Sequence, residues 1–340
     1  MTKLILRKLG WALLTIAFVL LLNFFLFRVM GDPTRLLKDP RLSQATIEAI
    51  RVRFGLDKPV INCFETLNPI KASLNACGVN PFNTQFAAYL SNLLKGDLGV
   101  SFHSQRPVAE LLTERLWNTL LLIGAGQILA IIIGIILGLV AAWKARTVLD
   151  YSALVGSLTV WSLPTFWLGI LLLFWGSNYL GLPLGGKETI GSGLTGLKRL
   201  GDIGTHLLLP TLTFTLVFIG EYMLIMRSTV LDVLSEDYIL TAKAKGLSTF
   251  QILKDHALRN AMLPIVTIVA LNLGFTVAGA IQIETVFSWP GLGLTIFEAV
   301  GRRDYPVLQG AFLLLAVSVV LANVIADLLY TFLDPRVRLA

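Results

Sequence analysis

Long apolar runs alternate with short polar connections along the chain. Six strongly apolar runs of at least 18 residues contain no Asp, Glu, Lys or Arg: 9–27, 116–143, 151–186, 203–220, 260–283 and 305–326. A helix needs about 20 such residues to cross the hydrocarbon core of a bilayer. The pattern therefore predicts an all-α membrane protein with six transmembrane helices.

Composition agrees with this interpretation. Of the 340 residues, 55% are hydrophobic and only 14% are charged, whereas soluble proteins carry about 25% charged residues. A large soluble enzyme and a disordered scaffold are therefore excluded. The net charge of +7 does not predict a nucleic-acid partner, because membrane proteins collect Lys and Arg at the cytoplasmic ends of their helices.

The first apolar run follows Lys3, Arg7 and Lys8, as the core of a signal peptide would. It is longer than the 7–15 apolar residues of a signal peptide, and no small-residue cleavage site follows it. We therefore expect residues 1–30 to form a short cytoplasmic N-terminus and an uncleaved first span.

The distribution of Lys and Arg predicts the orientation, because short cytoplasmic loops are rich in them. With the N-terminus inside, the short cytoplasmic pieces hold twelve Lys and Arg and the short outer pieces hold five. These pieces are 1–8, 144–150, 227–259 and 333–340 inside, and 187–202 and 284–304 outside. We expect both termini in the cytoplasm, a small extracytoplasmic domain at 31–115, a five-helix core at 116–332 and a cytoplasmic tail at 333–340.

The segment 31–115 carries two predicted short helices and both cysteines. Ser43 can cap a helix that ends at Gly55, and 85–94 is predicted to form a second helix. Cys63 and Cys77 lie on the predicted oxidising side of the membrane. We expect them to form a disulfide; the alternative is two unpaired, small apolar residues.

The chain lacks the usual signatures of catalysis or metal binding. His103, His206 and His256 are far apart in sequence and belong to no zinc motif. Residues 181–188 resemble a phosphate-binding loop, but Glu188 replaces the hydroxyl residue that would hold magnesium. We expect no enzymatic activity, no metal and no cofactor bound by this chain.

The predicted cytoplasmic loop 227–262 has a distinct helical pattern. Ser235 is predicted to start a short helix, with Glu236 and Asp237 in its first turn, and Gly246 to end it. Ser248 is predicted to cap a second helical stretch that ends near Leu263-Pro264. On the first helix, Tyr238, Ala242 and Ala244 would offer a surface of small residues for docking into a partner, while Lys243 and Lys245 stay solvated. From the residues alone, an ordinary solvated loop is an equal alternative.

The loop resembles the EAA loop of ABC-importer permeases. Thr241-Ala242 stands where the family has an alanine pair before a glycine, here Gly246, and Leu263-Pro264 matches its closing apolar-proline pair. Further motifs resemble the dipeptide and oligopeptide branch over nearly the whole chain: 55–59 (GLDKP), 96–101 (GDLGVS), 256–261 (HALRNA), 284–293 (ETVFSWPGLG), 302–306 (RRDYP) and 334–336 (DPR). Leu224 departs from the family, which often has an arginine there, and Glu221 is unusual.

The resemblance implies a type I ABC-importer permease fold in a bacterial inner membrane. It implies a second homologous permease, two ABC ATPase subunits that hold ATP and magnesium, and an extracytoplasmic peptide-binding protein as partners. The residues that would couple to the ATPase are Glu236, Asp237, Tyr238, Thr241, Ala242, Ala244, Lys245, Gly246, Leu263 and Pro264. Di- and oligopeptides are the expected cargo; importers of nickel and glutathione share these motifs. A secondary transporter is less expected, because the six spans show no inverted repeat.

Polar residues near the predicted spans are candidates for the translocation pathway: Glu221, Asn272, Gln282 and Glu284. A carboxylate within a span is costly unless it is paired. Glu221 is therefore expected either to contact a cationic substrate group or a gate partner, or to reach the interface or pair with Arg227. The motif 289–293 is expected to form either a tight re-entrant turn or a plain loop with an interfacial tryptophan.

Two features predict how the spans pack. Pro164 interrupts the run 151–186 and predicts a kink, because proline frees a backbone carbonyl. Gly134 and Gly138 lie four residues apart, a spacing that allows another helix to approach closely.

Overall fold

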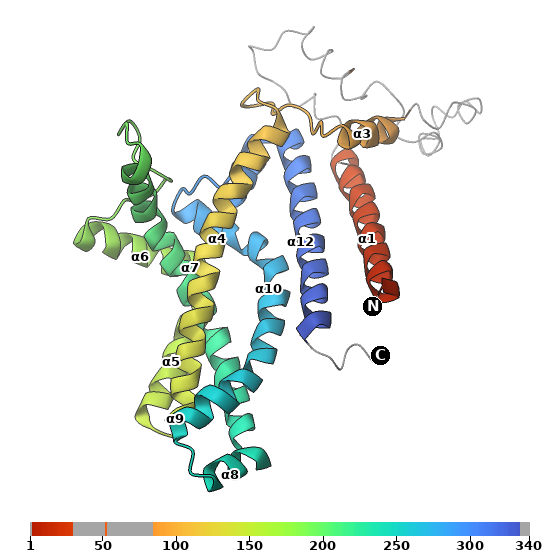
Figure 1. Cartoon of the computed structure of the whole chain (residues 1–340). Coiled ribbons are helices and arrows are strands. Elements are labelled where there is room, and N and C mark those ends of the chain that lie inside the picture. Colours follow the sequence, from red (N-terminus) through yellow and green to blue (C-terminus); the bar gives the residue numbers. More distant parts are fainter. Residues whose placement is uncertain (1, 30–51, 53–83, 334–340) are drawn as a thin grey trace. The chain divides into compact units, whose positions relative to one another are not determined.

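A computed structural model describes residues 2–29, 52 and 84–333 of the chain. All regular elements in this part are helices, apart from an isolated bridge between Val100 and Pro107. Figure 1 shows them: α1 (Thr2–Val29), α3 (Gln85–Leu94), α4 (Val108–Trp143), α5 (Val148–Ser162), α6 (Thr165–Leu180), α7 (Gly196–Leu234), α8 (Asp237–Ala244), α9 (Thr249–Gln251), the π-helical segment η4 (Ile252–Ala257), α10 (Leu258–Val286), α11 (Leu292–Arg302) and α12 (Tyr305–Leu333).

Several expectations fall outside the described residues. The helix predicted after Ser43, the pair Cys63 and Cys77, most of the segment 31–115 and the tail at 334–340 all lie there. The predicted helix at 85–94 is confirmed with the same bounds. The hydroxyl of Thr84 caps it by accepting a hydrogen bond from the Ala87 amide at 3.1 Å.

The apolar helices agree with a membrane protein. Four described helices are long and apolar enough to cross a bilayer: Leu6–Phe27, Val108–Trp143, Gly196–Leu234 and Tyr305–Ile325. The pair α5 and α6 would add a fifth span if the two helices are counted as one. α10 covers the predicted run 260–283 but is not among these helices. The structure thus confirms an all-helical membrane protein, while six spans remain a prediction.

The predicted kink at Pro164 is a corner. α5 ends at Ser162, α6 begins at Thr165, and the two axes differ by 103°. Proline has no amide hydrogen, and its ring clashes with the carbonyl one turn earlier, so a helix cannot continue through it undistorted. The run 151–186 is therefore two helices of 15 and 16 residues, each shorter than the ~20 residues that a span requires.

The chain forms two compact units. Unit 1 comprises residues 1–12, 116–294 and 318–340, and unit 2 comprises residues 13–115 and 295–317. In unit 1, α7 contacts α5, α6 and α10. Its buried residues Met226 and Val230 join Leu253 and Ala257 of η4 and Ala261 of α10 in one apolar cluster.

The glycine pair in α4 allows the expected close helix packing. A Cβ atom at Gly134 would lie 2.6 Å from Cβ of Tyr222, and one at Gly138 would lie 2.6 Å from the carbonyl oxygen of Met223. Only glycine permits this separation between α4 and α7.

Unit 2 has its own core of aromatic side chains. Phe24 of α1 is fully buried and contacts Phe86 and Tyr89 of α3. The amide of Asn23 donates a hydrogen bond to the carbonyl oxygen of Gln309 in α12 at 3.0 Å. These contacts join segments that lie far apart in the sequence.

Candidate functional site

The helix α8 is the short helix predicted in the loop 227–262, but it begins differently from the prediction. Ser235 is the C-cap of α7, and its hydroxyl donates to the carbonyl oxygen of Asp232 at 2.6 Å. Glu236 is the N-cap of α8, without a side-chain capping bond, and Asp237 lies in the first turn. Ser235 is therefore not the cap of α8, because its hydroxyl already closes the end of the preceding helix.

The end of α8 at Gly246 is confirmed. Gly246 has a φ of +78°, a conformation that a Cβ atom disfavours. Its amide bonds to the carbonyl of Lys243 at 2.9 Å, and the amide of Leu247 bonds to the carbonyl of Ala242 at 3.3 Å. These two bonds form a Schellman motif, which fixes the direction of the chain after α8.

One face of α8 packs onto its own chain. Ile239 is fully buried, Ala242 is 5% exposed, and both form a small apolar cluster with Ile252 of η4. We expected Ala242 on a docking surface, and this was wrong: its small side chain lets α8 approach η4. Tyr238 is held from another side, because Asn260 donates to its hydroxyl at 2.9 Å.

The opposite face of α8 is open. Leu240 is 68% exposed although it is apolar, and Tyr238 is 41% exposed. The remaining exposed residues from 236 to 246 are Glu236, Asp237, Thr241, Lys243, Ala244, Lys245 and Gly246. We call the surface formed by Tyr238, Leu240, Thr241 and Ala244 the α8 outer face. It offers apolar and small side chains flanked by charges of both signs.

The connection from α8 to α10 follows the predicted start but not the predicted end. Ser248 accepts from the amide of Gln251, and the Gln251 side chain accepts from the amide of Ser248 at 2.9 Å. This capping box confirms Ser248 as a helix cap. The helix does not end at Leu263-Pro264, which lies inside α10. The helix instead continues through Pro264, and the π-helical segment η4 leads directly into α10.

A buried ion pair anchors α7 beside this loop. The guanidinium of Arg227 donates to both oxygens of Asp150 in α5, at 2.5 and 2.7 Å, and Asp150 is 0% exposed. The amide of Arg146 also donates to Asp150 at 2.8 Å. A bidentate pair with an added backbone bond is the geometry in which a buried ion pair is well compensated.

Glu221 bonds to Asn272 and not to Arg227, the basic partner considered in the sequence analysis. Arg227 is engaged by Asp150, and Glu221 accepts a hydrogen bond from the side-chain amide of Asn272 at 2.9 Å. The same amide lies 3.4 Å from the hydroxyl of Tyr222, which also accepts from Gln127. Two of the predicted pathway residues, Glu221 and Asn272, are thus brought together in a polar cluster between α4, α7 and α10.

Glu284, another of the pathway candidates, lies inside the protein. It is 0% exposed and accepts hydrogen bonds from the hydroxyl of Thr119 at 2.6 Å and from the amide of Leu294 at 3.0 Å. The Thr119 hydroxyl in turn accepts from the amide of Leu292 at 2.7 Å. Glu284 therefore organises the turn after α10, because a carboxylate can accept from several donors at once. Gln282, two residues earlier, is exposed.

The motif 289–293 is a tight turn held to α4. Trp289 is 0% exposed, and its indole donates to the carbonyl oxygen of Asn118 at 2.9 Å, so it is not an interfacial tryptophan. The side chain of Asn118 returns a bond to the carbonyl of Pro290 at 2.8 Å. Gly291 leaves no room for a Cβ atom, which would collide with the carboxylate of Glu284.

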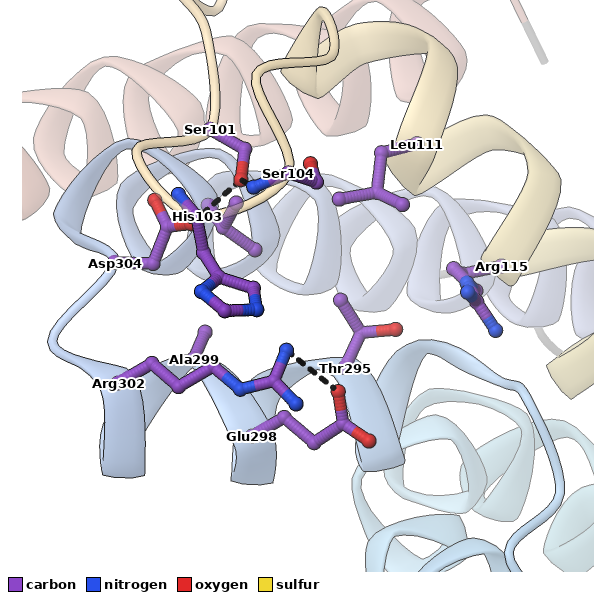
Figure 2. Close-up of a pocket in the computed structure, with 11 residues that line it drawn as sticks. Ser101, His103, Ser104, Leu111, Arg115, Thr295, Glu298, Ala299, Arg302 and Asp304 are labelled. Atoms are coloured by element: carbon purple, nitrogen blue, oxygen red, sulfur yellow. Dashed lines mark hydrogen bonds and ion pairs between the residues drawn. The ribbon is translucent and has the colours of Figure 1, made fainter. Parts of the chain in front are cut away.

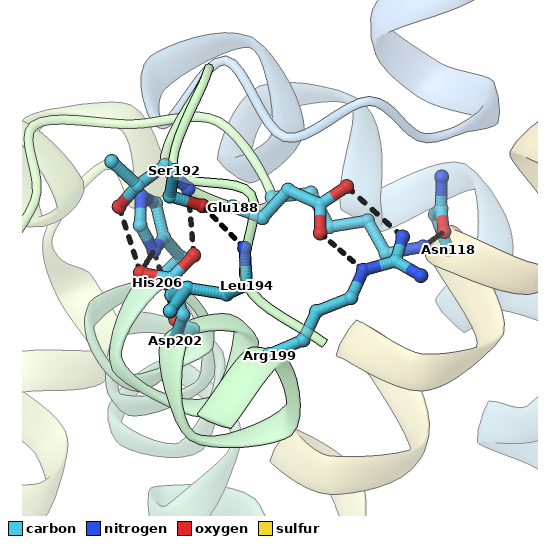
Figure 3. Close-up of polar contacts among 9 residues, drawn as sticks. Asn118, Glu188, Ser192, Leu194, Arg199, Asp202 and His206 are labelled. Carbon is cyan, nitrogen blue, oxygen red and sulfur yellow. Dashed lines mark hydrogen bonds and ion pairs between the residues drawn. The ribbon is translucent and has the colours of Figure 1, made fainter. Parts of the chain in front are cut away.

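The loop between α6 and α7 is also held by polar contacts (Figure 3). Lys187 donates to the side-chain oxygen of Asn118 at 2.8 Å, and Arg199 forms an ion pair with Glu188 at 2.6 Å. The neighbouring Arg199 guanidinium lowers the pKa of the Glu188 carboxyl. The residues that resembled a phosphate-binding loop therefore bond to other parts of their own chain.

Sequence analysis missed the buried polar partners. Asp150, Thr119 and Asn118 are 0–6% exposed and hold the ends of α7 and α10. The sequence signal that could have indicated them is their position, because each is a polar residue at the edge of an apolar run. The described part of the chain contains no group of three His, Cys, Asp or Glu that could hold a metal ion.

Comparisons with known proteins agree with this architecture. Residues 134–339 match the family described as binding-protein-dependent transport system inner membrane component. The chain is 36% identical over 358 residues, 99% of each chain, to the dipeptide transport system permease protein DppB of Escherichia coli K12. It is 36% identical to the glutathione transport system permease protein GsiC of Escherichia coli O6:H1, covering 98% and 97% of the two chains.

A third relative is an oligopeptide permease. The oligopeptide transport system permease protein AppB of Bacillus subtilis 168 is 35% identical over 323 residues, 94% of each chain. These relatives are permeases and not catalytic subunits, and they match from end to end. The chain therefore belongs to the family of binding-protein-dependent transport system inner membrane components.

Proposed function

We propose that the chain is the transmembrane permease subunit of an ATP-driven importer of di- and oligopeptides. The observation that carries this proposal is the match of nearly the whole chain to a dipeptide and an oligopeptide permease. The glutathione permease among the relatives supports the same cargo class, because glutathione is itself a small peptide. The subunit forms one half of the pathway, and a second homologous permease forms the other.

The proposed arrangement in the membrane has six spans with both termini in the cytoplasm. Its support is the Lys and Arg count of the short loops and the positions of the apolar helices. The loop 227–262 then lies in the cytoplasm, and the turn 284–294 lies outside. An extracytoplasmic binding protein delivers peptide at the outer side, next to the domain 31–115.

The α8 outer face is the proposed contact with an ATPase subunit. Leu240 and Tyr238 are 68% and 41% exposed there, and exposed apolar side chains that are grouped together are typical of a binding surface. The Schellman motif at the C-terminal end of α8 and its apolar cluster with η4 hold the helix rigidly on its own chain. ATP and magnesium stay in the two ATPase subunits, whose closure would push α8 and move the attached spans.

The polar cluster of Glu221 and Asn272, together with the exposed Gln282, is the proposed part of the pathway wall. Glu221 is half-buried and is not paired with Arg227, which binds Asp150. Carboxylates within membrane spans typically face an aqueous cavity or a functional partner. Glu221 would therefore contact a cationic group of the passing peptide.

Reconstitution tests the proposed function. The assembled transporter, with both permeases, both ATPases and the binding protein, is placed in proteoliposomes, and uptake of a labelled dipeptide is measured with and without ATP. We expect uptake only with ATP and binding protein. Uptake of a nickel chelate in place of any peptide would refute the cargo, and uptake by the isolated subunit without ATPases would refute the class.

Crosslinking tests the docking surface. A cysteine at Leu240 should crosslink to an ATPase subunit and should be labelled from the cytoplasmic side only. A cysteine at Ala242 is the matched control, because this position is two residues away on the same helix but buried. Equal crosslinking at both positions, or labelling of Leu240→Cys from outside the cell, would contradict the proposed surface or orientation.

A further inference from the structure

Unit 2 contains a cavity that has no part in the proposed function. Its volume is about 110 Å³, and it lies between the turn 101–104, the first turns of α4 and the helix α11. This is well above the roughly 15 Å³ needed to admit one water. Figure 2 shows Arg115 on one side of the cavity and His103 with Arg302 on the other, with Thr295 between them.

The guanidinium of Arg115 has no carboxylate partner in the part of the chain that the structure describes. Its Nε atom is buried without a hydrogen-bond partner. Among the described residues, no carboxylate lies within ion-pair distance of Arg115, whereas Arg106, Arg199 and Arg227 each bind at least one. A buried donor on a charged group costs free energy when it stays unpaired. The cavity therefore holds a positive group that lacks an anion.

The acidic residues around the cavity are already engaged. Asp304 accepts from the hydroxyl of Ser101 at 2.6 Å and from the amides of Phe102 and His103 at 3.1 and 3.2 Å. Glu298 lies 3.5 Å from Arg302, in an ion pair drawn in Figure 2. Asp304 thus serves to hold the turn 101–104 over the cavity, and neither acid satisfies Arg115.

We propose that this cavity binds a phosphate group, with Arg115 as its main ligand and Arg302 and His103 on the opposite wall. A guanidinium presents two parallel N–H donors that match two phosphate oxygens. The group is either the headgroup of a phospholipid or free phosphate. The lipid source suits Arg115 because it immediately precedes the apolar run 116–143, and arginine at such a boundary reaches headgroups.

The test compares Arg115→Gln with Arg303→Gln in the assembled transporter. Arg303 is exposed, lies outside the cavity lining and undergoes the same change of charge. Native mass spectrometry counts the phospholipids retained after mild delipidation, and thermal unfolding is followed while inorganic phosphate or acetate is added. We expect Arg115→Gln to lose one retained lipid, or to bind inorganic phosphate about tenfold or more weakly than the wild type.

The two measurements separate the sources. Loss of a retained lipid identifies a headgroup, and loss of stabilisation by phosphate with unchanged lipid identifies free phosphate. Equal behaviour of Arg115→Gln and wild type in both measurements would overturn the proposal, as would stabilisation by acetate and not by phosphate. If Arg115→Gln does not assemble, Arg115→Lys is used instead. It keeps the positive charge but lacks the two parallel N–H donors of the guanidinium, so it should bind the phosphate group more weakly than the wild type. Peptide uptake is not the readout, so a failure here leaves the proposed function untouched.

Discussion

The loop around α8 and the turn 284–294 are both short connections, yet they are held in different ways. The loop uses bonds between neighbouring residues: the Schellman motif at Gly246, the capping box at Ser248 and a small apolar cluster. The turn uses Glu284, whose fully buried carboxylate bonds to Thr119, 165 residues away in the sequence.

This difference distinguishes a surface that can bind a partner, the α8 outer face, from a turn that stabilises its own chain. Local bonds leave the α8 outer face uncovered and available to a partner subunit. In the turn 284–294, the polar groups of Glu284 and Trp289 form hydrogen bonds within the chain, and both side chains are buried. A rigid turn at the end of α10 and an accessible helix near its beginning suit a helix that is moved at one end only.

Replacing Glu284 by leucine should break the turn most severely. The Thr119 hydroxyl and the Leu294 amide would lose their acceptor, at about 1–3 kcal/mol each. Thermal unfolding of the purified transporter should show a large loss of stability. Glu110→Leu is the control, because Glu110 is exposed and its ion pair should contribute less than about 1 kcal/mol. Equal stability of the two variants would refute the supporting role of Glu284.

Replacing Leu240 by aspartate should affect binding and not folding. Leu240 is exposed, so the stability of the chain should change by less than about 0.5 kcal/mol. If it is central to the interface, loss of the side chain should weaken ATPase binding by about 2 kcal/mol. Pull-down of the ATPases in detergent measures this, and retention of full binding would remove the α8 outer face as the contact.

Replacing Gly246 by valine should disturb the direction of α8. A β-branched residue at a φ of +78° costs about 1–2 kcal/mol. We expect normal insertion but loss of coupling, seen as ATP hydrolysis without peptide uptake. Gly246→Asn is the matched variant, because asparagine tolerates this conformation, and it should restore uptake. Tight coupling in Gly246→Val would show that the Schellman motif is dispensable.

Replacing Ser248 by alanine should have the smallest effect. It removes one half of the capping box, which is worth about 1 kcal/mol. Hydrogen exchange of the amides at 249–252 should become faster, with little change in global unfolding. Exchange that also accelerates in 284–294 would show that the two regions are not independent.

The success of sequence analysis depended on the range of the interactions. The helix 85–94, the end at Gly246, the cap at Ser248 and the break at Pro164 were predicted because each depends on residues within one or two turns. The prediction that Ser235 starts α8 was wrong because Ser235 can cap either the end of α7 or the start of α8, and its hydroxyl bonds to α7. The prediction that Ala242 lies on a docking surface was wrong because a small residue on a short helix can pack either against a partner or against the chain's own core.

The sequence by itself determined an all-helical membrane protein of the permease family and the end of α8 at Gly246. Only the tertiary structure decided that Arg227 pairs with Asp150 rather than Glu221, that Glu284 is internal and that the buried Nε of Arg115 has no hydrogen-bond partner among the described residues. The physical reason is that caps and breaks act along the backbone. The partner of a buried charge, by contrast, depends on how distant helices pack.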